Sequence, residues 1–148
     1  MSNNKEPLRE ITLEEALNIF QRNKKIYRGI IIQQSLVTVK SMYKYNVKKI
    51  TCTLDDDPTD LEPWILYTVL MSENDLNSLS KELADGPWYA HFFDVFDKYL
   101  IVVFKNKRFI CDYQDKETWK DAINYGIKIG IPKEQLDFKY LERFSMTI

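Results

Sequence analysis

Apolar and polar positions change period along this chain, and each change of period predicts an element. From Lys48 to Leu54 every second residue is apolar, which is typical of a strand with one buried face. Residues 64–71 carry no charge and are rich in aromatic and branched side chains, as expected of a central strand. The connection between the two is too short for a helical crossover, so we expect them to pair antiparallel.

Three further strands are predicted in the C-terminal half, at residues 88–95, 99–104 and 108–113. Short turns separate them, at residues 96–98 and 105–107. Strands joined by turns of this length form an antiparallel meander.

Two helices are predicted from capping boxes, in which a hydroxyl residue is followed three positions later by an acidic one. Thr12 and Glu15 open the first helix, and Ser72 and Asp75 open the second, which continues to Leu83. The first helix carries an apolar stripe made of Leu13, Ala16, Leu17 and Phe20.

A third helix follows Asp115, which can cap its first turn, and Gly130 and Pro132 end it. One face of this helix is predicted to hold Trp119, Ala122, Ile123, Gly126 and Ile127. Gly126 is expected to allow close packing. The following residues can form one short helical turn.

The segment Lys24–Tyr45 fits two patterns. Ile30, Ile31 and Ile32 favour a strand, whereas apolar residues at helical spacing favour a helix. We predict a helix, because Asn46 is suited to the position after a helix end and the pattern changes there. Strands remain the alternative.

Together these elements predict one α+β domain over residues 1–148, with an antiparallel sheet of about five strands and helices packed on one face. The length of 148 residues fits one domain. We expect residues 1–10 to be flexible. Residues 139–148 are expected to form a C-terminal arm that docks through its apolar residues, Tyr140, Leu141 and Phe144.

The segments Thr118–Gly126 and Gly130–Phe138 give the chain a resemblance to a family of small uncharacterised bacterial proteins. The similarity runs mainly from Trp88 to Phe138. It implies a domain of the same kind, and it implies no catalytic motif, cofactor or ligand.

Composition points to an ordered protein, with 45% hydrophobic and 14% aromatic residues and few glycines and prolines. The N-terminal residues have no apolar core of a signal peptide, and no apolar run approaches the length of a membrane span. We therefore expect a soluble, cytoplasmic protein without a membrane partner. Cys52 and Cys111 match no C-x-x-C pattern and are expected to be ordinary thiols.

Charge is distributed unevenly although the net charge is −1. Residues 16–53 hold eight basic side chains and no acidic one, while residues 54–97 hold eleven acidic side chains and one basic. A basic face could bind a polyanion such as nucleic acid. The residues that would form it are Lys24, Lys25, Arg28, Lys44, Lys48 and Lys49. Neutralisation by the acidic segment is the alternative, and the pI of 5.9 makes a nucleic-acid partner the weaker interpretation.

His91 is the single histidine, so imidazole chemistry would depend on it. A small-ligand pocket could form around His91, Tyr89, Asp94 and Cys111. Strand alternation places His91 with Tyr89 and Phe93, and if that face is the core, His91 is a neutral interior residue. An aromatic setting would raise the pKa of Cys111 and weaken it as a nucleophile.

The acidic run from Asp55 to Glu62 lacks EF-hand spacing, and we interpret it as a solvated loop rather than a metal site. Phosphate-binding glycine loops and hydrolase motifs are absent from the sequence. The sequence therefore predicts no cofactor. It favours a non-enzymatic binding or regulatory protein with a protein partner, because tryptophan and tyrosine are enriched at interfaces. A ligand binder or enzyme around His91 is the second hypothesis, and polyanion binding is the third.

Overall fold

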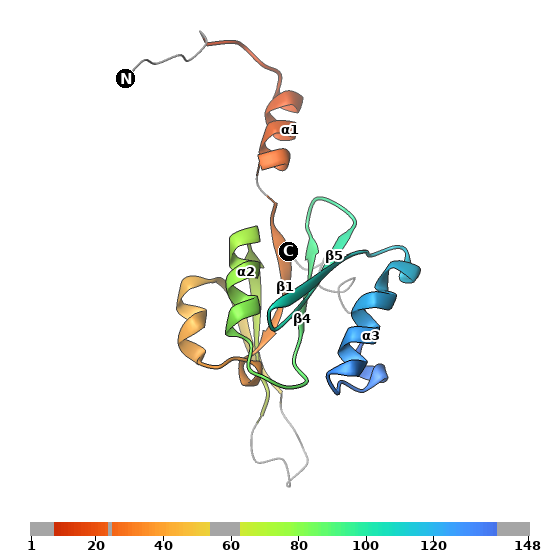
Figure 1. Ribbon diagram of the computed structural model, residues 1–148. Coiled ribbons are helices and arrows are strands. Elements are labelled where there is room, and N and C mark those ends of the chain that lie inside the picture. Colours follow the sequence, from red (N-terminus) through yellow and green to blue (C-terminus); the bar gives the residue numbers. More distant parts are fainter. Residues whose placement is uncertain (1–7, 24, 54–62, 139–148) are drawn as a thin grey trace, which may run out of the picture.

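A six-stranded antiparallel sheet forms the centre of the computed structural model, which describes residues 8–23, 25–53 and 63–138 (Figure 1). The strand order across the sheet is β2-β3-β1-β4-β5-β6. The strands are β1 (Tyr27–Ile32), β2 (Asn46–Cys52), β3 (Ile65–Met71), β4 (Ala90–Asp94), β5 (Tyr99–Phe104) and β6 (Lys107–Asp112). The α-helices are α1 (Leu13–Asn23), α2 (Glu73–Glu82) and α3 (Lys120–Lys128). Short 3₁₀ helices are η1 (Gln33–Ser35), η2 (Val39–Lys44), η3 (Lys116–Trp119) and η4 (Lys133–Gln135).

Each face of the sheet carries its own apolar core. Along β5, Ile101 and Val103 belong to the core beneath α2, and the alternate residues belong to the core beneath α3. The α2 side is completed by Leu76, Leu79 and Leu83, and the α3 side by Trp119, Ala122, Leu136 and Phe138. Burial on both faces explains why β5 is apolar at consecutive positions. We call the two faces of the sheet the α2 side and the α3 side.

The predicted fold class, α+β with an antiparallel sheet, is confirmed. The sheet has six strands where about five were expected, and the helices cover both faces where one was expected. The extra strand is β1, which lies between β3 and β4, so that β1 and β4 are the two central strands of the sheet.

The helix predicted for residues 24–45 is wrong. Residues 27–32 form β1, which pairs antiparallel with both β3 and β4, so that Tyr27 lies opposite Met71 on one side and Asp94 on the other. Two short 3₁₀ helices follow, and Asn46 begins β2 instead of ending a helix. The isoleucine run 30–32 therefore follows its strand preference, because β3 pairs with its backbone, while residues 27–29 pair with both β3 and β4.

Both capping boxes are present. At α2, the Asp75 N–H donates to Ser72 Oγ at 3.1 Å, and the Ser72 N–H donates to the Asp75 carboxylate at 2.9 Å. At α1, the Glu15 N–H donates to Thr12 Oγ1 at 3.1 Å. The predicted antiparallel β2–β3 pair and the β4–β5–β6 meander are also confirmed.

Two glycines are required by close packing. A Cβ at Gly29 would lie 2.3 Å from the His91 carbonyl oxygen and 2.4 Å from the Phe92 ring, so only glycine lets β1 approach β4 here. A Cβ at Gly126 would lie 2.7 Å from Leu136 Cδ2, in agreement with the predicted close packing of α3. Ile127, in contrast, is 45% exposed and does not share the buried face of that helix.

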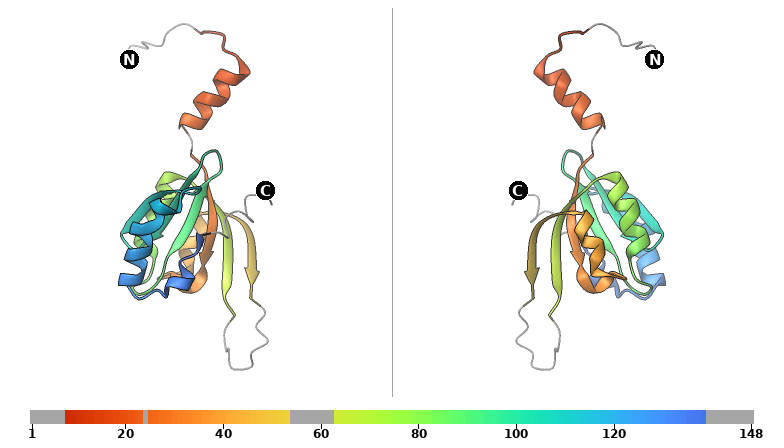
Figure 2. Two further views of the ribbon diagram at one scale, coloured as in Figure 1. Left: turned by 90° about the vertical axis from the view of Figure 1, so that its right-hand side faces the viewer. Right: turned by 90° about the vertical axis from the view of Figure 1, so that its left-hand side faces the viewer.

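Helix α1 stands beyond one end of the sheet in all three views (Figures 1 and 2). The predicted C-terminal arm lies outside the described residues, as do residues 1–7. Phe138, the last described residue, is fully buried. No helix among the described residues is long and apolar enough to cross a membrane.

Candidate functional site

The structure brings His91 and Tyr89 together on the α3 side of the sheet. Their ring centroids lie 5.9 Å apart. The Tyr89 hydroxyl donates a hydrogen bond to the Gln135 carbonyl, and Phe138 packs edge-on against His91 with 5.3 Å between centroids. These contacts come from the segment after α3, which closes over β4. His91 is thus covered by aromatic rings instead of lining an open pocket.

The environment of His91 keeps its imidazole neutral. The Nδ1 atom is buried and has no hydrogen-bond partner among the described residues, although the residue as a whole is only partly buried. Burial lowers the pKa of His91 to about 4, against the opposing pull of the Asp137 carboxylate. An imidazole with this pKa is a poor base near neutral pH, because its basicity falls with its pKa.

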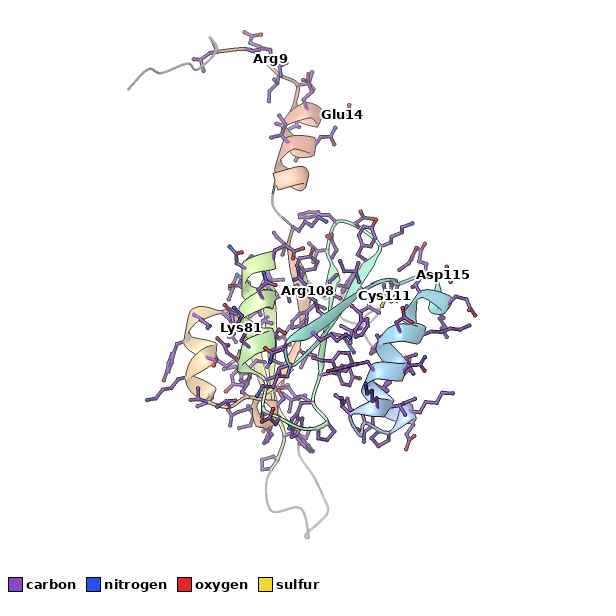
Figure 3. The ribbon with its side chains drawn as sticks, in the orientation of Figure 1. Arg9, Glu14, Lys81, Arg108, Cys111 and Asp115 are labelled. Atoms are coloured by element: carbon purple, nitrogen blue, oxygen red, sulfur yellow. The ribbon has the colours of Figure 1, made fainter. Side chains whose placement is uncertain are left out.

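Cys111 and Asp94 do not join His91. In register, Cys111 pairs with Leu100, which pairs with Phe93, so Cys111 lies two strands away from β4, at roughly 10 Å. Cys111 is buried near α3 (Figure 3), and burial raises the pKa of its thiol to about 11. Asp94 lies on the α2 side, where its carboxylate accepts from the Phe96 N–H at 2.9 Å. The structure therefore separates the four residues of the predicted pocket into a His91–Tyr89 pair and two distant groups.

The six residues of the predicted polyanion site have different surroundings. Lys44 forms an ion pair with Glu82, and Lys25 lies 5.8 Å from the Tyr99 ring centroid. Arg28 is 9% exposed. Lys48 and Lys49 are exposed on the edge strand β2, and Lys24 lies outside the described residues. The contact between Lys44 and Glu82 agrees with the alternative interpretation, in which the acidic segment neutralises the basic one.

The acidic run at residues 55–62 lies outside the described residues. Within residues 8–23, 25–53 and 63–138, the structure contains no group of three or more histidine, cysteine or acidic side chains that could hold a metal ion.

A hollow of about 530 Å³ lies where β3 ends and α2 begins. Its apolar wall consists of Ile26, Leu70 and Met71. The carboxylate at its rim, Glu73, is already bound, because it accepts from the Tyr27 hydroxyl and lies 3.0 Å from Arg108 Nη1. Burial and this carboxylate raise the pKa of Tyr27. The Tyr27, Glu73 and Arg108 side chains therefore bind one another and stabilise the fold.

The feature that stands out is the orientation of α1. Successive helical residues are about 100° apart, so Leu13 and Leu17 lie on the side opposite Glu15 and Asn18. Glu15, Asn18 and Ile19 line a hollow of about 780 Å³ between α1 and the β4–β5 turn. The face of α1 that carries Glu15, Asn18 and Ile19 is thus turned towards the sheet, and Leu13 and Leu17 are turned away from it.

Two leucines of the apolar stripe of α1 are open to solvent. Leu13 is 77% exposed and Leu17 is 52% exposed. Phe20 occupies the next position of the same spacing. Figure 3 shows Glu14 projecting from α1 well away from the sheet. The sequence identified this stripe, but helical spacing alone could not reveal that it faces away from the domain.

Among the described residues, helix α1 has few of the contacts that normally stabilise a short helix. It has 11 residues, and an isolated helix shorter than ~12–15 residues is marginal in water. The capping box supports its first turn, and Arg9 forms an ion pair with Glu15 at 3.4 Å. That pair is exposed and stabilises little. The helix therefore needs packing against its apolar stripe that its own sheet does not supply.

Comparison of the chain with protein-family models, curated proteins and solved structures found no match. The resemblance of residues 88–138 to small bacterial proteins stays a prediction. Function must therefore be inferred from the geometry of the chain itself.

Proposed function

We propose that this chain is a non-enzymatic binding domain that docks the apolar stripe of α1 into a hydrophobic groove of another protein. The observation that carries this proposal is the orientation of the stripe. Leu13 and Leu17 are exposed on the side of α1 opposite the sheet, while the side that faces the sheet carries Glu15 and Asn18 beside one apolar residue, Ile19. An amphipathic helix usually turns its apolar side towards its own core, so this arrangement suits an external partner.

The spacing of the stripe defines the shape of the groove. Leu13, Ala16, Leu17 and Phe20 follow the i, i+3, i+4, i+7 spacing by which amphipathic helices enter grooves. Full burial of one leucine side chain contributes roughly 2 kcal/mol. Glu10 and Glu14 are exposed near the start of the helix, so the groove is expected to carry basic side chains at that end.

A groove fits α1 better than a second copy of the same helix. Two helices of three turns each meet along one narrow line of side chains, whereas a specific interface needs about 1,000 Å² or more. A groove encloses the helix on several sides and buries more of the same residues. We therefore assign the stripe to a different protein.

The two alternative functions have weaker support. A pocket centred on His91 would require an accessible imidazole, and the ring of His91 is covered by Phe138 and Tyr89. Polyanion binding would require free cations on one face, and Lys44 is neutralised by Glu82.

The proposal is tested by affinity capture with three tagged forms of the full chain. These are the wild type, the variant Leu13→Glu/Leu17→Glu, and the matched control Asn18→Glu, which adds a carboxylate to the opposite face of α1. We expect a defined protein to be retained by the wild type and the control and lost from the double variant. Equal retention by all three forms, or no protein that depends on the stripe, contradicts the proposal.

A further inference from the structure

The two edges of the sheet differ in how well they are protected. At the β6 edge, the Asp112 N–H donates to Thr118 Oγ1 at 2.8 Å, and the Asp112 carbonyl accepts from Trp119 Nε1 at 2.9 Å. The segment η3 thus covers the end of β6. No such side-chain cover of a β2 backbone group occurs among the described residues. Exposed edges of this kind are templates for pairing with another strand.

The register between β2 and β3 determines which backbone N–H and carbonyl groups of β2 point away from the sheet. The Thr53 N–H donates to the Trp64 carbonyl at 2.9 Å, so Thr53 faces β3. Antiparallel strands alternate, and Thr51 therefore also faces β3, opposite Leu66. The N–H and carbonyl groups of Ile50 and Cys52 consequently point away from the sheet.

Only the first half of β2 carries features that prevent it from pairing with another strand. A register shift occurs between Val47 and Lys49, and Lys48 and Lys49 place charge on the edge. Bulges and lysines are the usual means of preventing edge pairing. From Ile50 to Cys52 the strand has neither, and Ile50 is 62% exposed.

We propose that β2 pairs antiparallel with β2 of a second copy of this chain, about a two-fold axis at Thr51. In this register Ile50 of one copy lies opposite Cys52 of the second copy. The N–H of each residue donates a hydrogen bond to the carbonyl of the other. Thr51 lies opposite Thr51, and threonine pairs across strands are favourable. This surface is separate from α1, and the inference does not rest on the proposed function.

Charge favours a second copy in this orientation. The two lysines lie at one end of the strand, so antiparallel pairing places Lys49 opposite Thr53 and keeps the lysines of the two copies apart. Parallel pairing would place like charges side by side and is disfavoured. Because the open backbone groups of Ile50 and Cys52 are complementary to each other, the surface fits its own copy.

Disulfide trapping tests this register. In a Cys52→Ser background, Thr51→Cys places two thiols at a non-hydrogen-bonded pair, where Cα atoms lie about 4.5 Å apart, within the range of a disulfide. Lys49→Cys in the same background is the matched control, because the two thiols would be about 13 Å or more apart. We expect mild oxidation to give a covalent dimer with Thr51→Cys and essentially none with Lys49→Cys.

A proline variant supplies the second measurement. Ile50→Pro removes an N–H that points away from the sheet and leaves the β2–β3 hydrogen bonds in place, so it should fold normally. Added to the Thr51→Cys protein, it should abolish the cross-link without changing the thermal midpoint by more than a few degrees. Equal cross-linking at positions 49 and 51, no cross-link at either, or a cross-link that survives Ile50→Pro overturns the proposal. A different protein cross-linked at position 51 in a lysate would also overturn it, by identifying another occupant.

Discussion

Phe138 packs against His91 with 5.3 Å between ring centroids and 78° between ring planes. The two residues lie far apart in the sequence. Phe138 follows α3 and η4 along the chain, and it covers His91 on the α3 side of β4. Trp119 also contacts Phe138, at 5.2 Å between centroids. The single histidine is therefore part of an aromatic core.

This contact predicts a pH-dependent loss of stability. The pKa of His91 is lowered to about 4 in the folded protein, from 6.5 when unfolded. The unfolded state therefore takes up a proton first as the pH falls below 6.5, and folding stability declines until the folded pKa is reached. At pH 5 we expect a loss of about 2 kcal/mol relative to pH 7, measured by urea denaturation.

His91→Phe supplies the control for that measurement. The chain has one histidine, so the variant removes the group that titrates in this window while the carboxylates remain. The difference in unfolding free energy between pH 7 and pH 5 should be smaller in the variant by about the same 2 kcal/mol. An identical pH dependence in the two proteins would show that His91 is not buried as described.

Gly29→Ala is expected to be strongly destabilising. The new Cβ would meet the His91 carbonyl oxygen at 2.3 Å, and backbone atoms cannot move aside without separating β1 from β4. We expect a loss of about 3 kcal/mol or more in thermal or urea unfolding. Gly126→Ala is the comparison, because there the clash is with the Leu136 side chain and alanine favours the helix. Its cost should be clearly smaller, and equal losses would contradict the close approach of β1 to β4.

Tyr45 connects the segment after η2 to the end of α2. Its hydroxyl donates to Glu82 Oε2 at 2.6 Å, and burial together with this carboxylate raises the pKa of Tyr45. Tyr45→Phe should cost about 1.5 kcal/mol, and a double-mutant cycle with Glu82→Gln should give a coupling of about 1 kcal/mol. Tyr43→Phe is the control, since Tyr43 is 92% exposed and should change stability by less than about 0.5 kcal/mol. Additive effects of the Tyr45 and Glu82 variants would argue against the hydrogen bond.

The elements that sequence patterns predicted correctly are those with local signals. Ser72 and Asp75 contact each other within one turn, so the start of α2 can be read from four residues. β5 and β6 are joined by a tight turn in which Asn106 has a positive φ of 57°. Hairpins of this kind need no information from the rest of the chain.

The error in residues 24–45 has a non-local cause. Both neighbours of β1 lie tens of residues further along the chain, and helical and strand spacing were equally compatible with its own residues. The predicted pocket failed to assemble for a related reason. Residues three apart on a strand face opposite sides, so His91 and Asp94 point apart on β4, and only the sheet order shows that Cys111 is two strands away. The orientation of α1 depends on its position beyond the sheet, which no period within the helix encodes.

The central claim, that the stripe of α1 is a partner surface, is tested most directly by site-specific photo-cross-linking. A photoreactive amino acid is placed at Leu17 on the stripe or at Asn18 on the face towards the sheet, and each of the two proteins is irradiated in lysate. We expect a discrete cross-linked protein of a different kind at position 17 and a much weaker or absent one at position 18. Cross-links from position 17 that lead only to the chain itself, or equal patterns at the two positions, would contradict the claim.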